Sequence, residues 1–168
     1  MEYPTDKYAR DGQEITGWWI RSDSLEGFSP ITQVYGICFD EKGGILICRQ
    51  SQERKWQIPG GHPESDESPE VTLVRELEEE TDVKVNNAKV LGVQKVNYPN
   101  NPDKYEGEVF YQARLICELD ELLPQTPDPD NGNVWERIFV PADKITEYVK
   151  WGEGGAAMFK DAVELWKK

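Results

Sequence analysis

The chain has 168 residues, 38% of them hydrophobic and 11% aromatic, which is enough apolar content for one folded domain over residues 1–168. Its 19 Lys and Arg residues against 32 Asp and Glu residues give a formal net charge of −13. Because so acidic a surface repels phosphate backbones, we expect no stable partnership with nucleic acid. A polyphosphate ligand would need metal ions or a local basic patch to be held.

The sequence also indicates where the protein resides. Residues 1–6 lack the basic and apolar regions of a signal peptide, and no apolar run approaches membrane-spanning length. Cys38, Cys48 and Cys117 lie in apolar segments, so we expect buried free thiols in a cytoplasmic protein that does not contact membranes. With one histidine and no C-x-x-C pair, zinc chemistry is not expected.

The first half of the chain predicts a hairpin that leads into a glycine-containing loop. Residues up to Pro30 are polar and turn-rich, apart from the apolar segment 17–20. Segments 31–39 and 45–48 are rich in β-branched residues, and the intervening turn contains two glycines, which together predict a hairpin.

A helix is predicted to begin after Ser68, with Pro69 at its first position. Helical spacing places its apolar side chains on one face and groups its glutamates on the opposite side. The predicted apolar face consists of Val71, Leu73, Val74 and Leu77, and the predicted carboxylate face consists of Glu76, Glu79 and Glu80.

The second half predicts more strands and two further helices. Strands are expected at 90–96, 109–117 and 135–140, and helices at 142–150 and 156–166. The long connections 97–106 and 120–133 are rich in Pro, Asn and Asp and are candidates for loops that border a site. Because strands and helices alternate irregularly, we predict an α/β (α+β) fold in which helices cover a mixed sheet.

The run Arg75-Glu76-Leu77-Glu78-Glu79-Glu80 places four carboxylates on the predicted helix. Like charges four residues apart destabilise a helix by about 0.2–0.5 kcal/mol per pair. A bound divalent cation would offset this repulsion and give the cluster a reason, because Mg²⁺ prefers carboxylate oxygens. A solvated acidic helix face is the alternative explanation for such a run.

The spacing around this run resembles the Nudix hydrolase box. The chain matches every defined position of that box except one, where Asp82 stands in place of glycine, and Ile58-Pro59 precedes the box as in the family. The matching residues are Gly61, Glu67, Arg75, Glu76, Leu77, Glu79, Glu80 and Val83.

The resemblance implies a Nudix-like α/β/α sandwich around a mixed sheet and Mg²⁺- or Mn²⁺-dependent hydrolysis of a phosphoanhydride bond. The substrate would be a nucleoside diphosphate linked to another group, such as a nucleotide sugar, ADP-ribose, a dinucleoside polyphosphate or a normal or oxidised nucleoside triphosphate. A homodimer is a candidate assembly. The implied metal ligands are Glu76, Glu79 and Glu80, and the implied catalytic residues are Glu79, Glu76 and Arg75.

Further candidates surround the box. Gly60 and Gly61 would let the loop pass close to the helix. The best local basic patch for phosphate is Arg49, Arg54 and Lys55, with simple surface charge as the alternative. The candidate additional acids are Glu67 and Glu136, and the general base stays unassigned.

Other residues near the box have two interpretations each. His62 could touch a phosphate or have no role, and Trp18 and Trp19 could stack on a base or simply pack. The pair Tyr98-Pro99 matches family features of two different substrate classes and does not choose between them.

Asp82 leaves two functional hypotheses open. Aspartate tolerates the left-handed conformation that glycine adopts at a helix end, which favours an active enzyme. The alternative is a non-catalytic nucleotide-binding sensor that keeps the Nudix fold.

Overall fold

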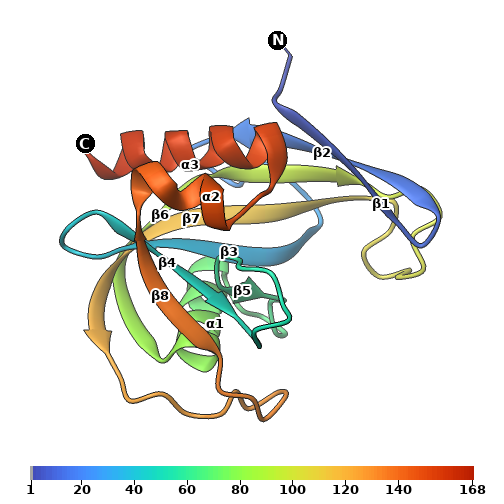
Figure 1. Ribbon diagram of the computed structural model, residues 1–168. Coiled ribbons are helices and arrows are strands. Elements are labelled where there is room, and N and C mark those ends of the chain that lie inside the picture. The colour runs from blue at the N-terminus through green and yellow to red at the C-terminus, as the bar shows by residue number, and fades with distance from the viewer. Residues whose placement is uncertain (1) are drawn as a thin grey trace.

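A computed structural model describes residues 2–168, which form one eight-stranded sheet, three α-helices and a short 3-10 helix (Figure 1). The strands are β1 (Thr5–Arg10), β2 (Gln13–Arg21), β3 (Ile31–Phe39), β4 (Gly44–Arg49), β5 (Gly60–Gly61), β6 (Val83–Asn97), β7 (Val109–Leu122) and β8 (Glu136–Pro141). The helices are α1 (Pro69–Thr81), the 3-10 turn η1 (Ala142–Lys144), α2 (Ile145–Tyr148) and α3 (Gly152–Trp166).

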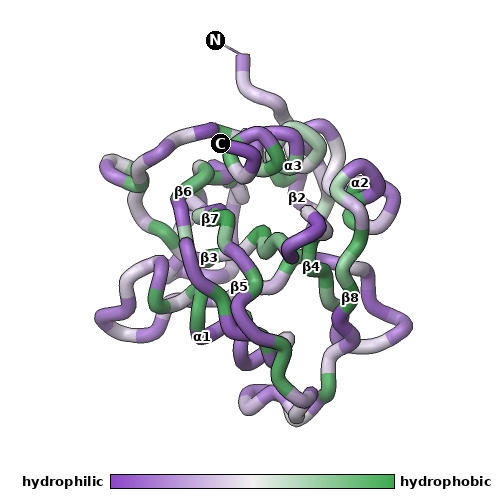
Figure 2. The backbone as a smooth tube through the Cα atoms, turned by 90° about the vertical axis from the view of Figure 1, so that its left-hand side faces the viewer, coloured by the Kyte–Doolittle hydropathy of each residue, from purple (hydrophilic) through white to green (hydrophobic). Residues whose placement is uncertain are grey.

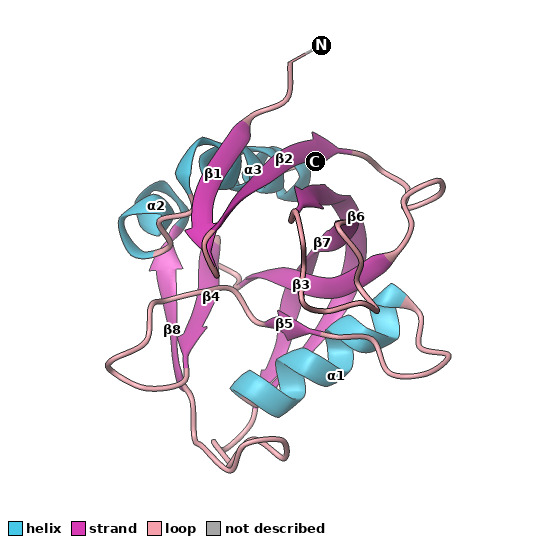
Figure 3. Ribbon diagram, turned by 90° about the vertical axis from the view of Figure 1, so that its right-hand side faces the viewer, coloured by secondary structure: helices cyan, strands magenta, loops and turns pink. Residues whose placement is uncertain are grey.

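The sheet is mixed, as predicted. Its strand order is β1-β2-β6-β7-β3-β4-β8, and β5 pairs with β3 outside this path. Strands β3 and β7 run parallel, whereas the other pairs are antiparallel. Helix α1 covers one face of the curled sheet, and α2 and α3 cover the other (Figure 3). The α+β sandwich inferred from the sequence is therefore confirmed.

Each face of the sheet has its own core. Val34 and Cys38 of β3 pack with Leu73 and Leu77 of α1. The alternate β3 residues, including Phe39, point toward the opposite core, which contains α3. Hydrophobic backbone stretches gather on the central strands, while the surrounding loops are mostly hydrophilic (Figure 2). Within residues 2–168, no helix combines the length and apolarity that crossing a bilayer requires.

The turn-rich interpretation of the first thirty residues is wrong, because β1 and β2 form a hairpin there. In β2, Ile15, Gly17 and Trp19 are buried in alternation with more exposed residues. This period of two is the pattern of a half-buried strand, and the polar outward residues masked it in the sequence. Several later strands are longer than predicted, so β6 starts at Val83 and β7 continues to Leu122.

Helix α1 begins where the sequence predicted it. The Ser68 hydroxyl accepts a 3.2 Å hydrogen bond from the backbone N–H of Val71, and Pro69 occupies the first turn. The helix ends at Thr81, and Asp82 follows with φ 52° and ψ 45°. Asp82 thus adopts the left-handed conformation expected of the glycine that it replaces.

The buried face of α1 differs from the predicted one. Val71 and Val74 are 54% and 42% exposed, so the prediction that they pack inward is wrong. At about 100° per residue, Glu80 and Glu76 lie about 20° and 60° from Leu73 on the helix circumference, whereas the two valines lie about 100° or more from it. The prediction that these glutamates point away from the packed face is therefore also wrong. The buried residues of α1 are Thr72, Leu73, Glu76, Leu77 and Thr81.

Candidate active site

Two glycines bring strand β5 directly against the carboxylates of α1. A Cβ added at Gly61 would lie 2.5 Å from Cδ of Glu76, so a side chain at Gly61 would displace that carboxylate. The backbone N–H of Gly60 donates a 3.2 Å hydrogen bond to Oε2 of Glu80. The close approach predicted for the glycine pair is confirmed, and it leaves Glu76 only 7% exposed.

Arg75 donates hydrogen bonds to three of the box carboxylates. Its Nε donates to Glu67 Oε2 at 2.9 Å, and its Nη1 donates to Glu76 Oε1 at 2.9 Å and Glu79 Oε2 at 3.1 Å. Nη2 also donates to the His62 carbonyl at 2.9 Å, which ties the loop before α1 to the helix. One guanidinium therefore fixes the orientation of three glutamates.

The charges of the site shift its pKa values in opposite directions. Hydrogen bonds from Arg75 lower the pKa of Glu67 to about 2. Burial, together with the nearby carboxylates of Glu76 and Asp128, raises the pKa of Glu80 to about 9. Burial also raises the pKa of Glu79, although Arg75 opposes that shift. The site thus carries more negative charge than its arginine balances.

This donor set suits a hard divalent cation. Glu76, Glu79 and Glu80 present carboxylate oxygens from one rigid helix, which are the ligands that Mg²⁺ prefers. Within residues 2–168, no three His, Cys, Asp or Glu side chains are already converged in a metal-holding arrangement. Arg75 occupies oxygens of Glu76 and Glu79 instead, and Glu80 turns to Gly60.

Asp82 has a role that the sequence did not reveal. Its carboxylate accepts hydrogen bonds from the backbone N–H of Thr126 at 2.9 Å and from the Thr126 hydroxyl at 2.6 Å. Arg137 donates to the carbonyl oxygens of Asp82 and Leu123 at 2.9 and 2.8 Å. These contacts fasten the loop between β7 and β8 to the end of the carboxylate helix. The departure from glycine was the one sequence signal for this link.

We expect Asp82→Gly to lower the free energy of unfolding by about 2–5 kcal/mol. Two hydrogen bonds to a carboxylate stabilise by about 1.5–3 kcal/mol each, and relief of the left-handed strain offsets about 1 kcal/mol. Urea denaturation measures the difference, and Thr126→Val serves as the partner variant. Because the two side chains share one contact, their effects should not add in the double variant. An Asp82→Gly chain as stable as the wild type would contradict this role.

The other predicted residues lie outside the cluster. Arg49 on β4 forms an ion pair with Glu136 on β8, and its guanidinium lies 4.3 Å from the Trp56 ring centroid. Arg54 is exposed in the connection between β4 and β5. Arg49 and Glu136 therefore neutralise each other, and the phosphate-binding role of Arg49 and Arg54 stays a prediction.

The aromatic candidates have structural contacts. Trp19 is 4% exposed, and its indole N–H donates to Asp161 Oδ2 at 2.7 Å. Tyr98 is also buried, and its hydroxyl donates to Asp11 Oδ2 at 2.6 Å. Packing accounts for both side chains. His62 is exposed, and its Nδ1 lies 2.8 Å from the Thr32 carbonyl oxygen.

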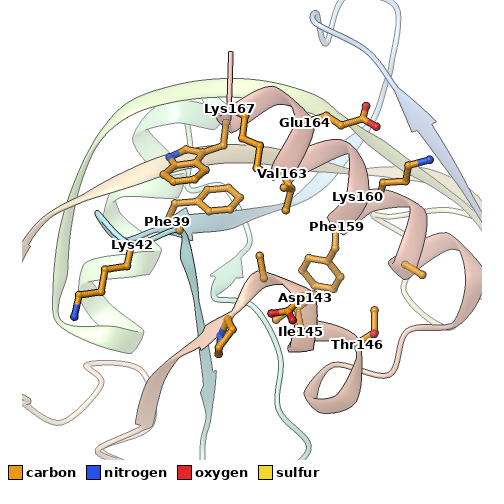
Figure 4. Close-up of a pocket in the computed structure, with 15 residues that line it drawn as sticks. Phe39, Lys42, Asp143, Ile145, Thr146, Phe159, Lys160, Val163, Glu164 and Lys167 are labelled. Atoms are coloured by element: carbon orange, nitrogen blue, oxygen red, sulfur yellow. The ribbon is translucent and has the colours of Figure 1, made fainter.

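A separate hollow of about 590 Å³ lies between the β3–β4 turn, η1, α2 and α3. Phe39, Phe159 and Val163 line it, and Lys42 and Lys160 lie at its margin (Figure 4). None of the box carboxylates among the described residues lines this hollow, so it is not part of the candidate active site.

Comparison with known proteins decides the family. A family model described as NUDIX domain matches residues 30–161, which include the whole glutamate cluster. The chain belongs to the NUDIX family. This NUDIX chain carries the family's box on α1 and the loop that precedes it, with Asp82 closing the helix.

Several curated NUDIX relatives share parts of the sequence. The "Putative ADP-ribose pyrophosphatase YjhB" of Bacillus subtilis (strain 168) is 26% identical over 148 residues, or 86% of this chain and 65% of the relative. A "MutT-like protein" of Streptomyces ambofaciens is 39% identical over 62 residues, covering 37% of this chain and 40% of the relative. An "RNA pyrophosphohydrolase" of Marinomonas sp. (strain MWYL1) is 34% identical over 67 residues, covering 40% of each. The chain thus spans between two fifths and two thirds of these relatives.

Solved NUDIX structures share the fold. The pyrophosphohydrolase BsRppH of Bacillus subtilis superposes with a TM-score of 0.66 at 18% identity, covering 95% of this chain and 96% of that one. A UDP-X diphosphatase gives a TM-score of 0.59 at 19% identity, covering 86% of this chain and 69% of that one. At these identities the likeness concerns the fold.

Proposed function

We propose that this NUDIX protein hydrolyses a phosphoanhydride bond in a nucleoside diphosphate linked to another group. The observation that carries the proposal is the cluster of Glu76, Glu79 and Glu80 around Arg75, in register with the family box. Pyrophosphate chemistry also appears in the names of the relatives, which include an ADP-ribose pyrophosphatase and an RNA pyrophosphohydrolase. These names span several nucleotide substrates and support the class without selecting one.

The residues of the cluster would act together with Mg²⁺ or Mn²⁺, held by Glu76, Glu79 and Glu80. Such an ion neutralises phosphate charge and lowers the pKa of a coordinated water. Arg75 holds Glu76 and Glu79 in place, and Glu67 anchors the opposite edge of the guanidinium. Gly60 and Gly61 keep the loop before α1 close to these side chains. Arg49 and Arg54 stay candidates for phosphate contacts.

The protein should be a cytoplasmic enzyme for small nucleotides, with a homodimer as the assembly to test. Cys38, Cys48 and Cys117 are free and buried, which agrees with a reducing compartment. The excess of acidic residues over basic ones disfavours stable binding to nucleic acid.

We expect the intact chain to release phosphate products from at least one member of a nucleotide panel only when Mg²⁺ or Mn²⁺ is supplied. The panel comprises nucleotide sugars, ADP-ribose, dinucleoside polyphosphates and normal and oxidised nucleoside triphosphates. EDTA should abolish turnover, and excess Mg²⁺ should restore it, because the carboxylates alone repel the anionic substrate. Tight binding without turnover at saturating metal would instead establish the sensor alternative.

A further inference from the structure

A second cavity, of about 550 Å³, lies on the sheet face opposite α1. Its floor comes from three neighbouring strands: Tyr35 on β3, Gln112 and Arg114 on β7, and Gln94 on β6. Trp151, just before α3, closes one side. The size is in the range of pockets that hold small ligands.

Arg114 is the unusual residue of this cavity. Although it is only 2% exposed, it forms no ion pair with any carboxylate in residues 2–168. Its Nη2 donates to the neutral side chains of Gln94 and Gln112, at 3.0 Å each, and its buried Nε–H has no hydrogen-bond partner. The guanidinium lies 4.4 Å from the Tyr35 ring centroid and 5.7 Å from a ring centroid of Trp151.

A buried charge without a counter-charge destabilises a fold unless something compensates it. Burial lowers the pKa of Arg114 to about 10, so the guanidinium remains charged at neutral pH. Buried polar groups nearly always have partners, so the Nε–H of Arg114 is a donor that an acceptor atom of a ligand could satisfy. An anion in the cavity would supply both the acceptor and the charge.

The rim of the cavity also carries basic side chains. Lys55 and Lys150 are exposed there, and Lys7 pairs with Glu14 at 3.0 Å. Among the described residues that line the cavity, Asp6 is the one with an acidic side chain. In a protein with a net charge of −13, this concentration of basic groups is local and specific.

Two contacts connect the cavity to the carboxylate cluster, one between Glu80 and Gly60 and one between Gly60 and Tyr35. Glu80 accepts from the backbone N–H of Gly60 at 3.2 Å, and a Cβ at Gly60 would lie 2.6 Å from Cδ1 of Tyr35. Tyr35 in turn lies under the Arg114 guanidinium and is its register partner across the parallel strands. Gly60 and Tyr35 therefore place the lining of the cavity next to the carboxylate cluster.

We propose that this cavity binds a phosphate group of the substrate through Arg114, with Lys55 and Lys150 at its entrance. This inference rests on the proposed function and narrows its substrate class. The preferred substrates carry a phosphate beyond the two of the cleaved bridge, as nucleoside triphosphates and dinucleoside polyphosphates do. Nucleotide sugars lack that additional group.

The test measures binding rather than hydrolysis, so that it is independent of the proposed reaction. Inorganic tripolyphosphate is titrated calorimetrically into the intact chain in EDTA at low salt. Arg114→Gln should weaken binding about 10- to 100-fold, because it removes charge-assisted hydrogen bonds. Lys160→Ala, at the separate hollow of Figure 4, removes the same kind of charge as a rim lysine and should leave binding unchanged. Adenosine, which has no phosphate, should not bind measurably.

The rim lysines keep the test decisive if Arg114→Gln does not fold. Both are exposed, so Lys55→Ala combined with Lys150→Ala should preserve the fold and weaken tripolyphosphate binding at least about threefold. Equal affinity in the wild type, the rim double variant and Lys160→Ala would overturn the proposal. Arg114-dependent binding of adenosine would overturn it as well, because the cavity would then recognise the nucleoside. Arg114-dependent tripolyphosphate binding in a chain that hydrolyses nothing would refute the hydrolase and keep the anion site.

Discussion

Replacing Glu79 with glutamine is expected to lower the turnover of the best nucleotide substrate by about 100-fold or more. Changes to groups that merely orient a metal ligand commonly reduce activity or metal affinity by about 10- to 100-fold, and the loss of a ligand itself should be no milder. Glu79 lies against Arg75 at 3.1 Å and is one of the three carboxylates proposed to hold Mg²⁺. Initial rates measured across a Mg²⁺ series would report the loss.

Glu78 provides the matched control on the same helix turn. Its side chain is exposed, and Glu78→Gln makes the same chemical change one residue away from Glu79. Turnover of this variant should stay within about twofold of the wild type, as expected for a surface substitution. If Glu78→Gln and Glu79→Gln both retained wild-type turnover, the glutamate face of α1 would not be the catalytic metal site.

Glu80→Gln is expected to change stability and activity in opposite directions. Without metal, the free energy of unfolding at pH 8 should rise by about 1–3 kcal/mol, because a buried carboxylate with a raised pKa is removed. The folded-state pKa of about 9 exceeds the ordinary value of 4.5, so folded chains hold this proton when unfolded chains have released it. The free energy of unfolding of the wild type should therefore decrease as the pH rises from 4.5 to about 9. Turnover of Glu80→Gln should fall, because the variant lacks one of the carboxylates proposed to hold the metal.

Urea denaturation at pH 5 and pH 8, with and without Mg²⁺, would separate these effects. Near pH 5 the carboxyl group of Glu80 is largely protonated in the folded state, so the variant and the wild type should differ little. At pH 8, Mg²⁺ should stabilise the wild type more than Glu80→Gln, because binding to the folded state adds stability. A Glu80→Gln chain less stable than the wild type at pH 8 without metal would show that the carboxylate is compensated in some other way.

The start of α1 and the residues of its carboxylate cluster could be predicted because their signals are local. Ser68 and Pro69 form a helix start within two positions, and the glycine-to-valine spacing of the box fixes which glutamates belong together. The orientation of the helix could not be read in the same way. Val71 and Val74 are apolar yet exposed, because strand β5 and its glycines cover the side that carries Glu76 and Glu80.

The residues that sequence reasoning missed depend on contacts between distant segments. Arg114 lies within the buried run 113–117 of strand β7, and its being the one charged residue of that run was its only local signal. Its environment comes from β3, β6 and the segment before α3, which the sheet topology brings together. Likewise, the Asp82–Thr126 link joins the end of α1 to a loop after β7.

The parallel pairing of β3 with β7 has a consequence for the order of folding. Parallel strands cannot be joined by a tight turn, and here α1 and β6 intervene along the chain before β7 can dock. Such non-local pairings slow folding because the chain loses loop entropy before the contact stabilises it. Strand β5 pairs with β3, which precedes it in the chain, whereas Arg114 lies on β7, so the proposed phosphate cavity forms only after β7 has docked. Ligand binding during refolding should therefore appear together with the complete sheet.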